Sequence, residues 1–396
     1  MRPANPIYAQ LSTTVFETMS RLAQETGAIN LGQGFPDEGF PPDVLAKAAD
    51  AVLTGWNQYP PMPGLPELRQ AIARHEQRFY GIERDWMRET LVTSGATEAL
   101  AAAILALVEP GDEVVLFEPF YDAYLPLIRR AGGVPKLISL SPPHWRFTAA
   151  MLEAAVTPKT RFVVLNNPVN PTGVVVPDED LALLAAFCVA HDLIAICDEV
   201  WEQVVFAPAL HRPLMAYPGM AERCVKIGSA GKMFGLTGWK VGFICAAAPL
   251  ARLLAKAHQF LTFTTPPNLQ VAVAFGLETL DDWWTMMPAS LAASQQRLAS
   301  APKAEGFAVL PSQGTYFINV DLAASGVAMA DRDFALLAVG EAGVATIPVS
   351  ALYETDPVTT ILRLCFAKSD ATLDEGARRL AKARDLAAQP PGGRAI

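Results

Sequence analysis

Two lysines lie in a glycine-rich stretch between apolar segments of the chain. Residues 229–243 read Ser-Ala-Gly-Lys-Met-Phe-Gly-Leu-Thr-Gly-Trp-Lys-Val-Gly-Phe, which places Lys232 and Lys240 among four glycines. Lysine is seldom buried unless it is paired or covalently used, and closely spaced glycines let a backbone approach a ligand. We therefore hypothesise that Lys232 binds pyridoxal phosphate as a Schiff base. For this stretch alone, an exposed turn is an equal alternative.

Asp198 has the position that a partner of the cofactor ring would need. Pyridoxal phosphate requires a lysine amine, a carboxylate at the pyridine nitrogen and donors around its phosphate. Asp198 directly follows the apolar segment 193–197, so its carboxylate is expected at the end of a strand. A cationic ring nitrogen would offset the cost of burying it. Considered alone, Asp198 fits a helix N-cap at least as well.

A phosphate site is predicted where a short strand meets an alanine-rich helix. Backbone N–H groups at the start of a helix bind anions well. The joining residues are Ser94, Gly95, Ala96 and Thr97. Ser229 and Lys240 would add a hydroxyl and a positive charge, although Lys240 also fits a solvated surface lysine.

Two further segments carry polar groups that suit an amino acid and a cofactor ring. In residues 166–173, Asn-Asn-Pro-Val-Asn-Pro-Thr-Gly, two prolines fix the backbone, and Asn166 and Asn170 project four residues apart. Asn170 could donate to the ring hydroxyl oxygen, whereas a plain turn is the alternative. Arg363 lies inside the apolar run Leu-Arg-Leu-Cys-Phe and suits a substrate carboxylate or an internal salt bridge.

Tyr121 follows a predicted strand and suits stacking on the ring, with a core aromatic as the alternative.

Short apolar segments alternate with helix-length segments from about residue 90 to residue 246. This alternation predicts a mostly parallel, doubly wound α/β sheet with helices on both faces. Ligands bind at the carboxyl ends of such strands, where the polar residues above are expected. The predicted strands are 91–94, 114–117, 161–165, 193–197, 224–229 and 241–246, and the predicted helices are 97–108, 122–131, 148–155 and 178–191.

The length of 396 residues favours more than one domain. We expect an N-terminal arm with part of a small domain at 1–40, a large cofactor-binding domain at 41–285 and a small α+β domain at 286–396. The small domain is expected to hold strands near 307–310, 315–320 and 361–366, and helices near 331–342 and 372–387.

Composition narrows the class of protein. A net charge of −9 without a dense basic cluster argues against a nucleic-acid surface. No apolar run approaches the roughly 20 residues that span a bilayer, and no basic region precedes an apolar one at the N-terminus. The five cysteines contain no Cys-x-x-Cys pair, which favours free thiols in a reducing compartment. We expect a cytoplasmic protein without a metal ion.

Several motifs together resemble the class I and II pyridoxal-phosphate aminotransferases over nearly the whole chain. They are Ser-x-Gly-Lys at 229–232, Gly-Trp-Lys-Val-Gly-Phe at 238–243, Asn-Pro-Thr-Gly at 170–173 and Asp-Glu-Val at 198–200. Residues 29–37, 57–64 and 362–368 are similar to the branch with the kynurenine/glutamine, methionine and N-succinyldiaminopimelate aminotransferases. The resemblance implies an aspartate-aminotransferase-like large domain with a seven-stranded-type sheet.

The resemblance also implies a role for each matching position. Lys232 would form the Schiff base, and the substrate carboxylate would meet Arg363, Asn170 and Gly34. Tyr59 would cross to the phosphate of the partner subunit in a homodimer, and Phe16 would lie at the mouth of the side-chain pocket. The positions implied around the cofactor are Asp198 at the pyridine nitrogen, Asn170 at the ring hydroxyl, Tyr121 on the ring face, and Ala96, Thr97, Ser229 and Lys240 at the phosphate.

Trp201 departs from this family, which usually has Asp-Glu-Val-Tyr where this chain has Asp-Glu-Val-Trp. The tyrosine donates a hydrogen bond to the ring oxygen. Its loss predicts a pKa of the Schiff base above that of relatives with tyrosine.

The resemblance implies transamination between an L-amino acid and a 2-oxo acid by ping-pong kinetics. A donor of the methionine, aromatic, glutamine or kynurenine type is expected. Alternatives are an N-succinyldiaminopimelate aminotransferase, a cysteine-conjugate carbon–sulfur β-lyase and a non-catalytic ligand sensor of this fold. A Rossmann dehydrogenase is poorly supported, because no predicted strand precedes Gly-x-Gly-x-x-Gly.

Overall fold

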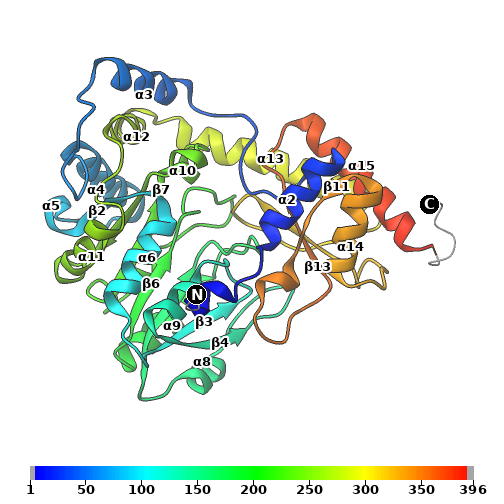
Figure 1. Cartoon of the computed structure of the whole chain (residues 1–396), viewed down its shortest axis with the longest axis horizontal. Coiled ribbons are helices and arrows are strands. Elements are labelled where there is room, and N and C mark those ends of the chain that lie inside the picture. Colours follow the sequence, from blue (N-terminus) through cyan, green and yellow to red (C-terminus); the bar gives the residue numbers. More distant parts are fainter. Residues whose placement is uncertain (1–4, 390–396) are drawn as a thin grey trace, which may run out of the picture.

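The computed structural model describes residues 5–389, and its main element is a seven-stranded sheet (Figure 1). Strand β8 pairs antiparallel with both of its neighbours, and the other pairs are parallel, so the predicted mostly parallel sheet is confirmed. The strands, in their order across the sheet, are β2 (Thr90–Thr93), β8 (Gly242–Ala246), β7 (Cys224–Ser229), β6 (Ile194–Asp198), β5 (Thr160–Asn166), β3 (Glu113–Glu118) and β4 (Val134–Ser139).

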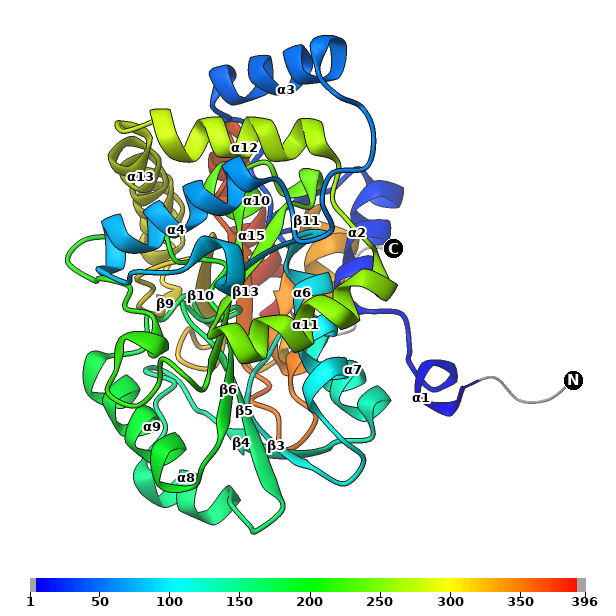
Figure 2. The same cartoon turned by 90° about the vertical axis from the view of Figure 1, so that its left-hand side faces the viewer.

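Apolar side chains on both faces of the strands explain the layers. On β5, Val164 packs into one buried cluster with residues of helix α6, whereas Val163 and Leu165 pack into another with residues of α9. Alternate residues of a strand point to opposite faces, so a continuous apolar run requires cover on both sides. Figure 2 shows α8 and α9 on one side of the central strands and α6, α7 and α11 on the other.

The helices around this sheet match the predicted positions closely, although several were not predicted. Helix α6 begins at Gly95, two residues earlier than predicted, because Gly95 adopts φ +74° and turns the chain out of β2. Unpredicted elements are the edge strand β4 and helices α4, α5, α10 and α11. The helices are α3 (Pro42–Thr54), α4 (Pro66–Tyr80), α5 (Trp86–Glu89), α6 (Gly95–Leu107), α7 (Tyr124–Ala131), α8 (Ala149–Ala155), α9 (Asp178–Ala190), α10 (Ala230–Met233), α11 (Ala248–Leu261) and α12 (Pro267–Thr279).

A four-stranded antiparallel sheet forms the second part of the molecule, in the order β12-β13-β10-β9. Helix α13 (Trp283–Ala304) leads into it and packs against α15. The predicted helix at 331–342 is divided into α14 and a π-helical turn, η3. The elements are β9 (Ala308–Val309), β10 (Phe317–Asp321), α14 (Asp331–Leu337), η3 (Ala338–Ala342), β11 (Val344–Ala345), β12 (Ile347–Pro348), β13 (Ile361–Cys365) and α15 (Asp370–Ala387).

Residues 15–30 of the N-terminal segment pack against this second part rather than the large sheet. Strand β1 (Ile29–Asn30) pairs in parallel with β11, and helix α2 (Val15–Thr26) contacts β11, β12 and η3. Helix α1 (Pro6–Ala9) precedes them.

The domain boundaries at residues 40 and 285 stay a prediction. Within residues 5–389, no helix combines the length and apolar character that a membrane crossing demands. The short 3₁₀ helices are η1 (Leu214–Ala216), η2 (Thr237–Trp239) and η4 (Val349–Leu352).

Candidate active site

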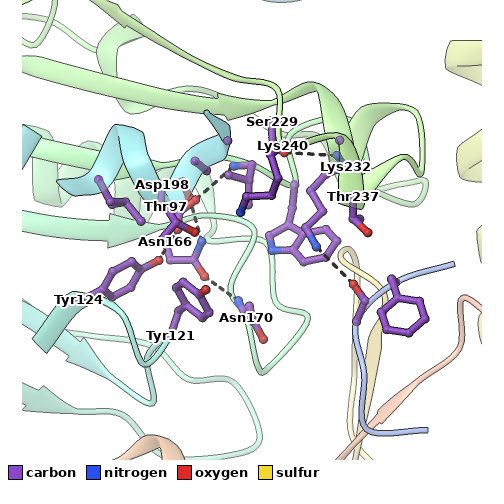
Figure 3. A pocket seen from close by; sticks show the side chains of 18 residues that line it. Thr97, Tyr121, Tyr124, Asn166, Asn170, Asp198, Ser229, Lys232, Thr237 and Lys240 are labelled. Atoms are coloured by element: carbon purple, nitrogen blue, oxygen red, sulfur yellow. Dashed lines mark hydrogen bonds between the residues drawn. The ribbon is translucent and has the colours of Figure 1, made fainter. Parts of the chain in front are cut away.

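A cavity of about 270 Å³ lies where the ends of β5, β6 and β7 meet the start of α6 (Figure 3). Most of the residues singled out from the sequence form its wall. These are Gly34, Gly95, Ala96, Thr97, Tyr121, Asn166, Asn170, Asp198, Trp201, Ser229, Lys232 and Lys240.

Lys232 lies on the short helix α10, directly after β7. The Ser229 hydroxyl accepts from the Lys232 backbone N–H at 3.3 Å, and the Tyr316 hydroxyl donates to the Lys232 carbonyl oxygen at 3.0 Å. The side-chain Nζ donates to the Gly34 carbonyl oxygen at 3.3 Å. Burial lowers the pKa of Lys232 to about 8, and the positive charge of Arg363 adds to this effect. The amine can therefore exchange a proton near neutral pH.

Asp198 ends β6 and is only 4% exposed. The Tyr124 hydroxyl donates to its Oδ2 at 2.5 Å, and the Val200 N–H donates to its Oδ1 at 3.4 Å. Burial raises the pKa of Asp198 to about 6, although the Tyr124 hydrogen bond and the Lys232 charge act against this rise. A cation in the cavity would offset that cost, so the site suits a carboxylate that meets a protonated ring nitrogen.

The start of α6 provides free backbone donors at one end of the cavity. The N-cap residue Ser94 makes no side-chain capping hydrogen bond, so the N–H groups of the first turn remain available for an anion. At Gly95, an added Cβ would lie 3.0 Å from the Cε of Lys240. This close approach brings the lysine to the helix start. Together with Ser229, these groups form a donor set suited to a phosphate.

A chain of hydrogen bonds joins the end of β6 to β13. Asn166 Nδ2 donates to the Asp198 carbonyl oxygen at 2.9 Å, and the Asn170 N–H donates to Asn166 Oδ1 at 2.7 Å. Asn170 Oδ1 in turn accepts from Nη1 of Arg363 at 2.7 Å. The loop 166–173 therefore fixes the arginine relative to the cavity wall.

Arg363 is buried, and the carboxylate of Asp122 acts on its charge from beyond ion-pair distance. It is 2% exposed, its Nη2 donates to the Gly32 carbonyl oxygen at 2.7 Å, and no ion pair involves it within residues 5–389. Its guanidinium lies 3.9 Å from the ring centroid of Phe317 and 4.9 Å from that of Phe16. Burial lowers the pKa of Arg363 to about 9. An unpaired buried guanidinium of this kind is suited to a carboxylate brought by a ligand.

Four of the predicted residues lie outside the cavity wall. Ser94 is the N-cap of α6, and Arg363 is joined to the wall through Asn170. Phe16 stacks on Arg363, and its place at the mouth of a side-chain pocket stays a prediction. Tyr59 is 81% exposed and contacts Phe263 edge-on at 5.5 Å on a separate surface.

The sequence did not identify Tyr124, which donates to Asp198. Tyr124 is buried at 1% exposure and begins α7, three residues after Tyr121. The i, i+3 spacing of two tyrosines directly after a strand was the available signal. The cavity wall also includes Thr237, which no motif reasoning had selected.

Taken together, these groups fit pyridoxal phosphate. The cavity combines an amine that loses its proton readily, a buried carboxylate and an uncapped helix start beside a lysine. Each of the three requirements of the cofactor is met by a different strand end of one sheet.

Comparisons with known proteins agree with this chemistry. Residues 26–380 match the family model for aminotransferase class I and II. The chain is 46% identical to a probable N-succinyldiaminopimelate aminotransferase of Mycobacterium tuberculosis, covering 93% of this chain and 96% of the relative. It is 41% identical to the methionine aminotransferase of Escherichia coli, covering 94% and 96%.

Solved structures share the fold. The N-succinyldiaminopimelate aminotransferase from Mycobacterium tuberculosis superposes with a TM-score of 0.93 at 45% identity, covering 96% of this chain and 100% of that chain. The aspartate aminotransferase from Thermus thermophilus with maleate superposes with a TM-score of 0.89 at 27% identity, covering 97% and 100%.

Proposed function

The chain belongs to the class I and II aminotransferases, and from that premise we propose that the cavity beside Lys232 is its transamination site. The enzyme depends on pyridoxal phosphate and moves an amino group between an amino acid and a 2-oxo acid. The single observation that carries the proposal is the joint presence of Lys232, Asp198 and the uncapped start of α6 around one cavity.

The wall residues predicted from the sequence would share the work of holding the cofactor. Lys232 would bind it covalently through Nζ, and Asp198 would hold its ring nitrogen, supported by the hydrogen bond from Tyr124. Tyr121 would stack on the ring, and Asn170 would face the ring hydroxyl. The phosphate would be held by residues 95–97 together with Ser229 and Lys240, as the free donors of α6 favour.

When bound, pyridoxal phosphate supplies an electron sink that stabilises the charge left as a proton leaves the Cα atom of an amino acid. Lys232 Nζ is the group of this chain that would take up that proton, because its pKa of about 8 lies near neutral pH. Arg363 would fix the carboxylate of the substrate and thereby orient the Cα–H bond. Arg363 is buried and Lys232 is partly buried, which limits the access of water to both groups.

We propose a donor with one carboxylate and an apolar, aromatic or amide side chain. Arg363 is buried and forms no ion pair within residues 5–389, with Asp122 acting on it only from a longer distance, whereas Lys368 is paired with Asp37 and Arg129 with Glu354. The rings of Phe16 and Phe317, which both lie close to the guanidinium, make its surroundings partly apolar. The 46% identical relative is a probable N-succinyldiaminopimelate aminotransferase, which makes that succinylated, more anionic substrate the second candidate.

A half-reaction panel tests the function and separates these donors. The holoenzyme is mixed with one amino acid at a time, without an oxo acid, and the visible absorbance of the cofactor is followed. Methionine, phenylalanine, glutamine, kynurenine and N-succinyl-diaminopimelate are compared at equal concentration. We expect the neutral side chains to react fastest. A preference for the succinylated substrate would overturn the donor assignment, and no absorbance change with any amino acid would overturn transamination.

We also propose a homodimer in which Tyr59 completes the partner's phosphate site. The surface near Tyr59 is unusually apolar, with Trp56 77% exposed, Leu53 83% exposed and Phe260 85% exposed. A groove along α12 is lined by Trp56, Tyr59 and Phe275. Exposed apolar side chains at such a groove favour a protein interface. Tyr59→Phe should weaken cofactor retention in the dimer, and a monomeric mass in solution would contradict the assembly.

The cytoplasm is the proposed location, because all five cysteines are buried free thiols. Reduced, unpaired thiols are typical of a reducing compartment.

A further inference from the structure

Trp201 lies against the amine of Lys232. The Lys232 Nζ is 4.4 Å from the centroid of the Trp201 ring and 5.7 Å from that of Tyr316. A cation within about 6 Å of a ring centroid is attracted by the negative ring face, most strongly by that of tryptophan. Trp201 is 2% exposed and Tyr316 1% exposed, so their rings are shielded from bulk water. We call the rings of Trp201 and Tyr316, together with the carbonyl oxygen of Gly34, the lysine cage.

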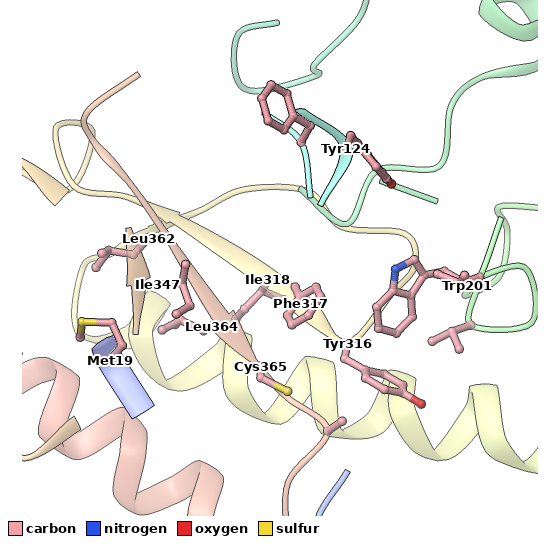
Figure 4. Packing of buried hydrophobic residues seen from close by; sticks show 14 of the residues in the cluster. Met19, Tyr124, Trp201, Tyr316, Phe317, Ile318, Ile347, Leu362, Leu364 and Cys365 are labelled. Atoms are coloured by element: carbon pink, nitrogen blue, oxygen red, sulfur yellow. The ribbon is translucent and has the colours of Figure 1, made fainter. Parts of the chain in front are cut away.

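Neighbouring side chains hold the cage in place (Figure 4). Trp201 meets Tyr316 edge-on, at a centroid distance of 4.7 Å and an interplanar angle of 79°, and meets Phe317 at 5.6 Å and 76°. The residue after Trp201, Glu202, accepts a hydrogen bond from the buried Lys226. Tyr316 and Phe317 therefore hold the Trp201 ring, and the hydrogen bond to Glu202 holds the next residue of the chain.

Other charged groups act on the same amine. Arg363 and Lys240 disfavour its positive charge, whereas Asp198 and Cys365 favour its charged form. Within residues 5–389, no carboxylate forms an ion pair with Lys232. The direct contacts given for Nζ are the hydrogen bond to the oxygen of Gly34 and the two aromatic rings of the cage.

We propose that Trp201 is a positioning residue for Lys232, and that its ring face holds the charged amine at the cavity wall whenever the lysine is not covalently engaged. The inference rests on the proposed function, because covalent use of Lys232 is what makes a resting position necessary. An ammonium on a ring face keeps its proton more firmly than one in an aliphatic site of equal burial. Trp201 therefore offsets part of the fall in the pKa of Lys232 that burial causes. Tryptophan here exchanges the hydroxyl of the usual tyrosine for a larger ring face.

Fluorinated tryptophan tests this role without opening a cavity. Fluorine withdraws electron density from the indole face at almost constant volume, and so weakens its attraction for a cation. The full-length chain, freed of cofactor, is prepared with ordinary tryptophan or with 5-fluorotryptophan. The rate at which acetic anhydride acetylates Lys232 is followed against pH by peptide mass spectrometry. Lys47, whose side chain is 39% exposed, serves as the reference lysine.

In the ordinary protein, we expect the acetylation rate of Lys232 to show an inflection near its pKa of about 8. After fluorination, the inflection should lie at a lower pH. Complete loss of a cation–π contact corresponds to about 0.4 to 1.5 pH units, so partial loss should give about 0.2 to 0.5. Trp201→Phe is the matched control, because fluorination replaces all seven tryptophans of the chain. In that variant, fluorination should cause no further change.

No shift in the protein that contains Trp201 would overturn the proposal, and so would an equal shift in Trp201→Phe. Circular dichroism checks folding, and Trp201→Tyr replaces the control if Trp201→Phe does not fold. Transamination by the unmodified holoenzyme is measured separately. A protein that fails to transaminate would therefore refute the proposed function while leaving the lysine titration readable.

Discussion

Two lysines six residues apart, Lys226 and Lys232, are buried in opposite ways. Lys226 is 0% exposed on β7, and its Nζ donates to the carboxylates of Glu76 and Glu202. Burial alone would lower the pKa of Lys226, but Glu202 and Glu76 outweigh it and raise the pKa well above its ordinary value. At Lys232 burial prevails, and the pKa falls to about 8.

The partners explain the difference. A buried cluster surrounds Lys226 and links α4 to the segment after β6. It consists of the carboxylates of Glu76 and Glu202 together with Arg84 and His75. We call Glu76, Glu202 and Lys226 the ion cluster. Lys232 and Arg363 form no close ion pair within residues 5–389, and the more distant Asp198 and Asp122 do not outweigh their burial, so the protein carries a cost that a ligand can remove. A buried charge with partners serves the fold, and one without them is available for a reaction.

Replacement of Lys232 by alanine should have the largest effect on activity. Without Nζ, the cofactor has no covalent attachment and the Cα proton has no acceptor. We expect turnover to fall by about 10⁴-fold or more. Steady-state transamination rates measure this, with the surface variant Lys47→Ala as the control. Lys232→Ala with more than a tenth of normal turnover would show that another group moves the proton.

Arg363→Lys should have the next largest effect, because lysine lacks the planar fork that binds a carboxylate with two hydrogen bonds. We expect kcat/KM for amino acids to fall roughly 10²- to 10³-fold. The matched measurement uses the corresponding amine without a carboxylate. Its rate should be similar in both proteins, and an equal loss for the amine would assign Arg363 a structural role instead.

Asp198→Asn should change how stability depends on pH in the chain without cofactor. Burial raises the folded pKa of Asp198 to about 6, above its usual value of about 4. The carboxyl therefore imposes no cost below pH 4, and stability is lost as pH rises towards 6 and above. We expect the variant to be more stable than the wild type by about 3 kcal/mol at pH 7 and equal to it at pH 3.5.

Chemical denaturation at equal protein concentration measures this dependence. Asp178→Asn is a matched surface control, because the hydrogen bond from Tyr217 lowers the pKa of Asp178 and gives a slope of opposite sign. A wild-type stability that rises from pH 4 to 6 relative to Asp198→Asn would contradict the assigned pKa.

The fold and much of the candidate site could be predicted from local sequence. Strand ends are readable from apolar runs, and the residues after them meet at one edge of a parallel sheet. This reasoning placed Asp198, Asn170 and Lys232 around one cavity, as the structure does. The element types were also correct, because both faces of the central strands are apolar.

Contacts between distant segments could not be predicted in this way. Lys226 lies in an apolar run just as Arg363 does, but its partner Glu76 is 150 residues away on α4. Which buried cation is paired depends on packing that no local pattern encodes. The hydrogen bond from Tyr124 to Asp198 and the contact of Trp201 with Lys232 have the same origin.

The contrast between the two lysines is tested most directly by making the same substitution at each. Lys226→Met and Lys232→Met are compared with the wild type without cofactor, by chemical denaturation at pH 7. Lys226→Met leaves the carboxylates of the ion cluster unpaired and should lose about 3 to 5 kcal/mol of stability. The lowered pKa of Lys232 means that its charged form is destabilised in the folded protein. Lys232→Met removes this cost and should raise the stability by about 1 to 3 kcal/mol. Changes of the same sign in both variants would contradict the account.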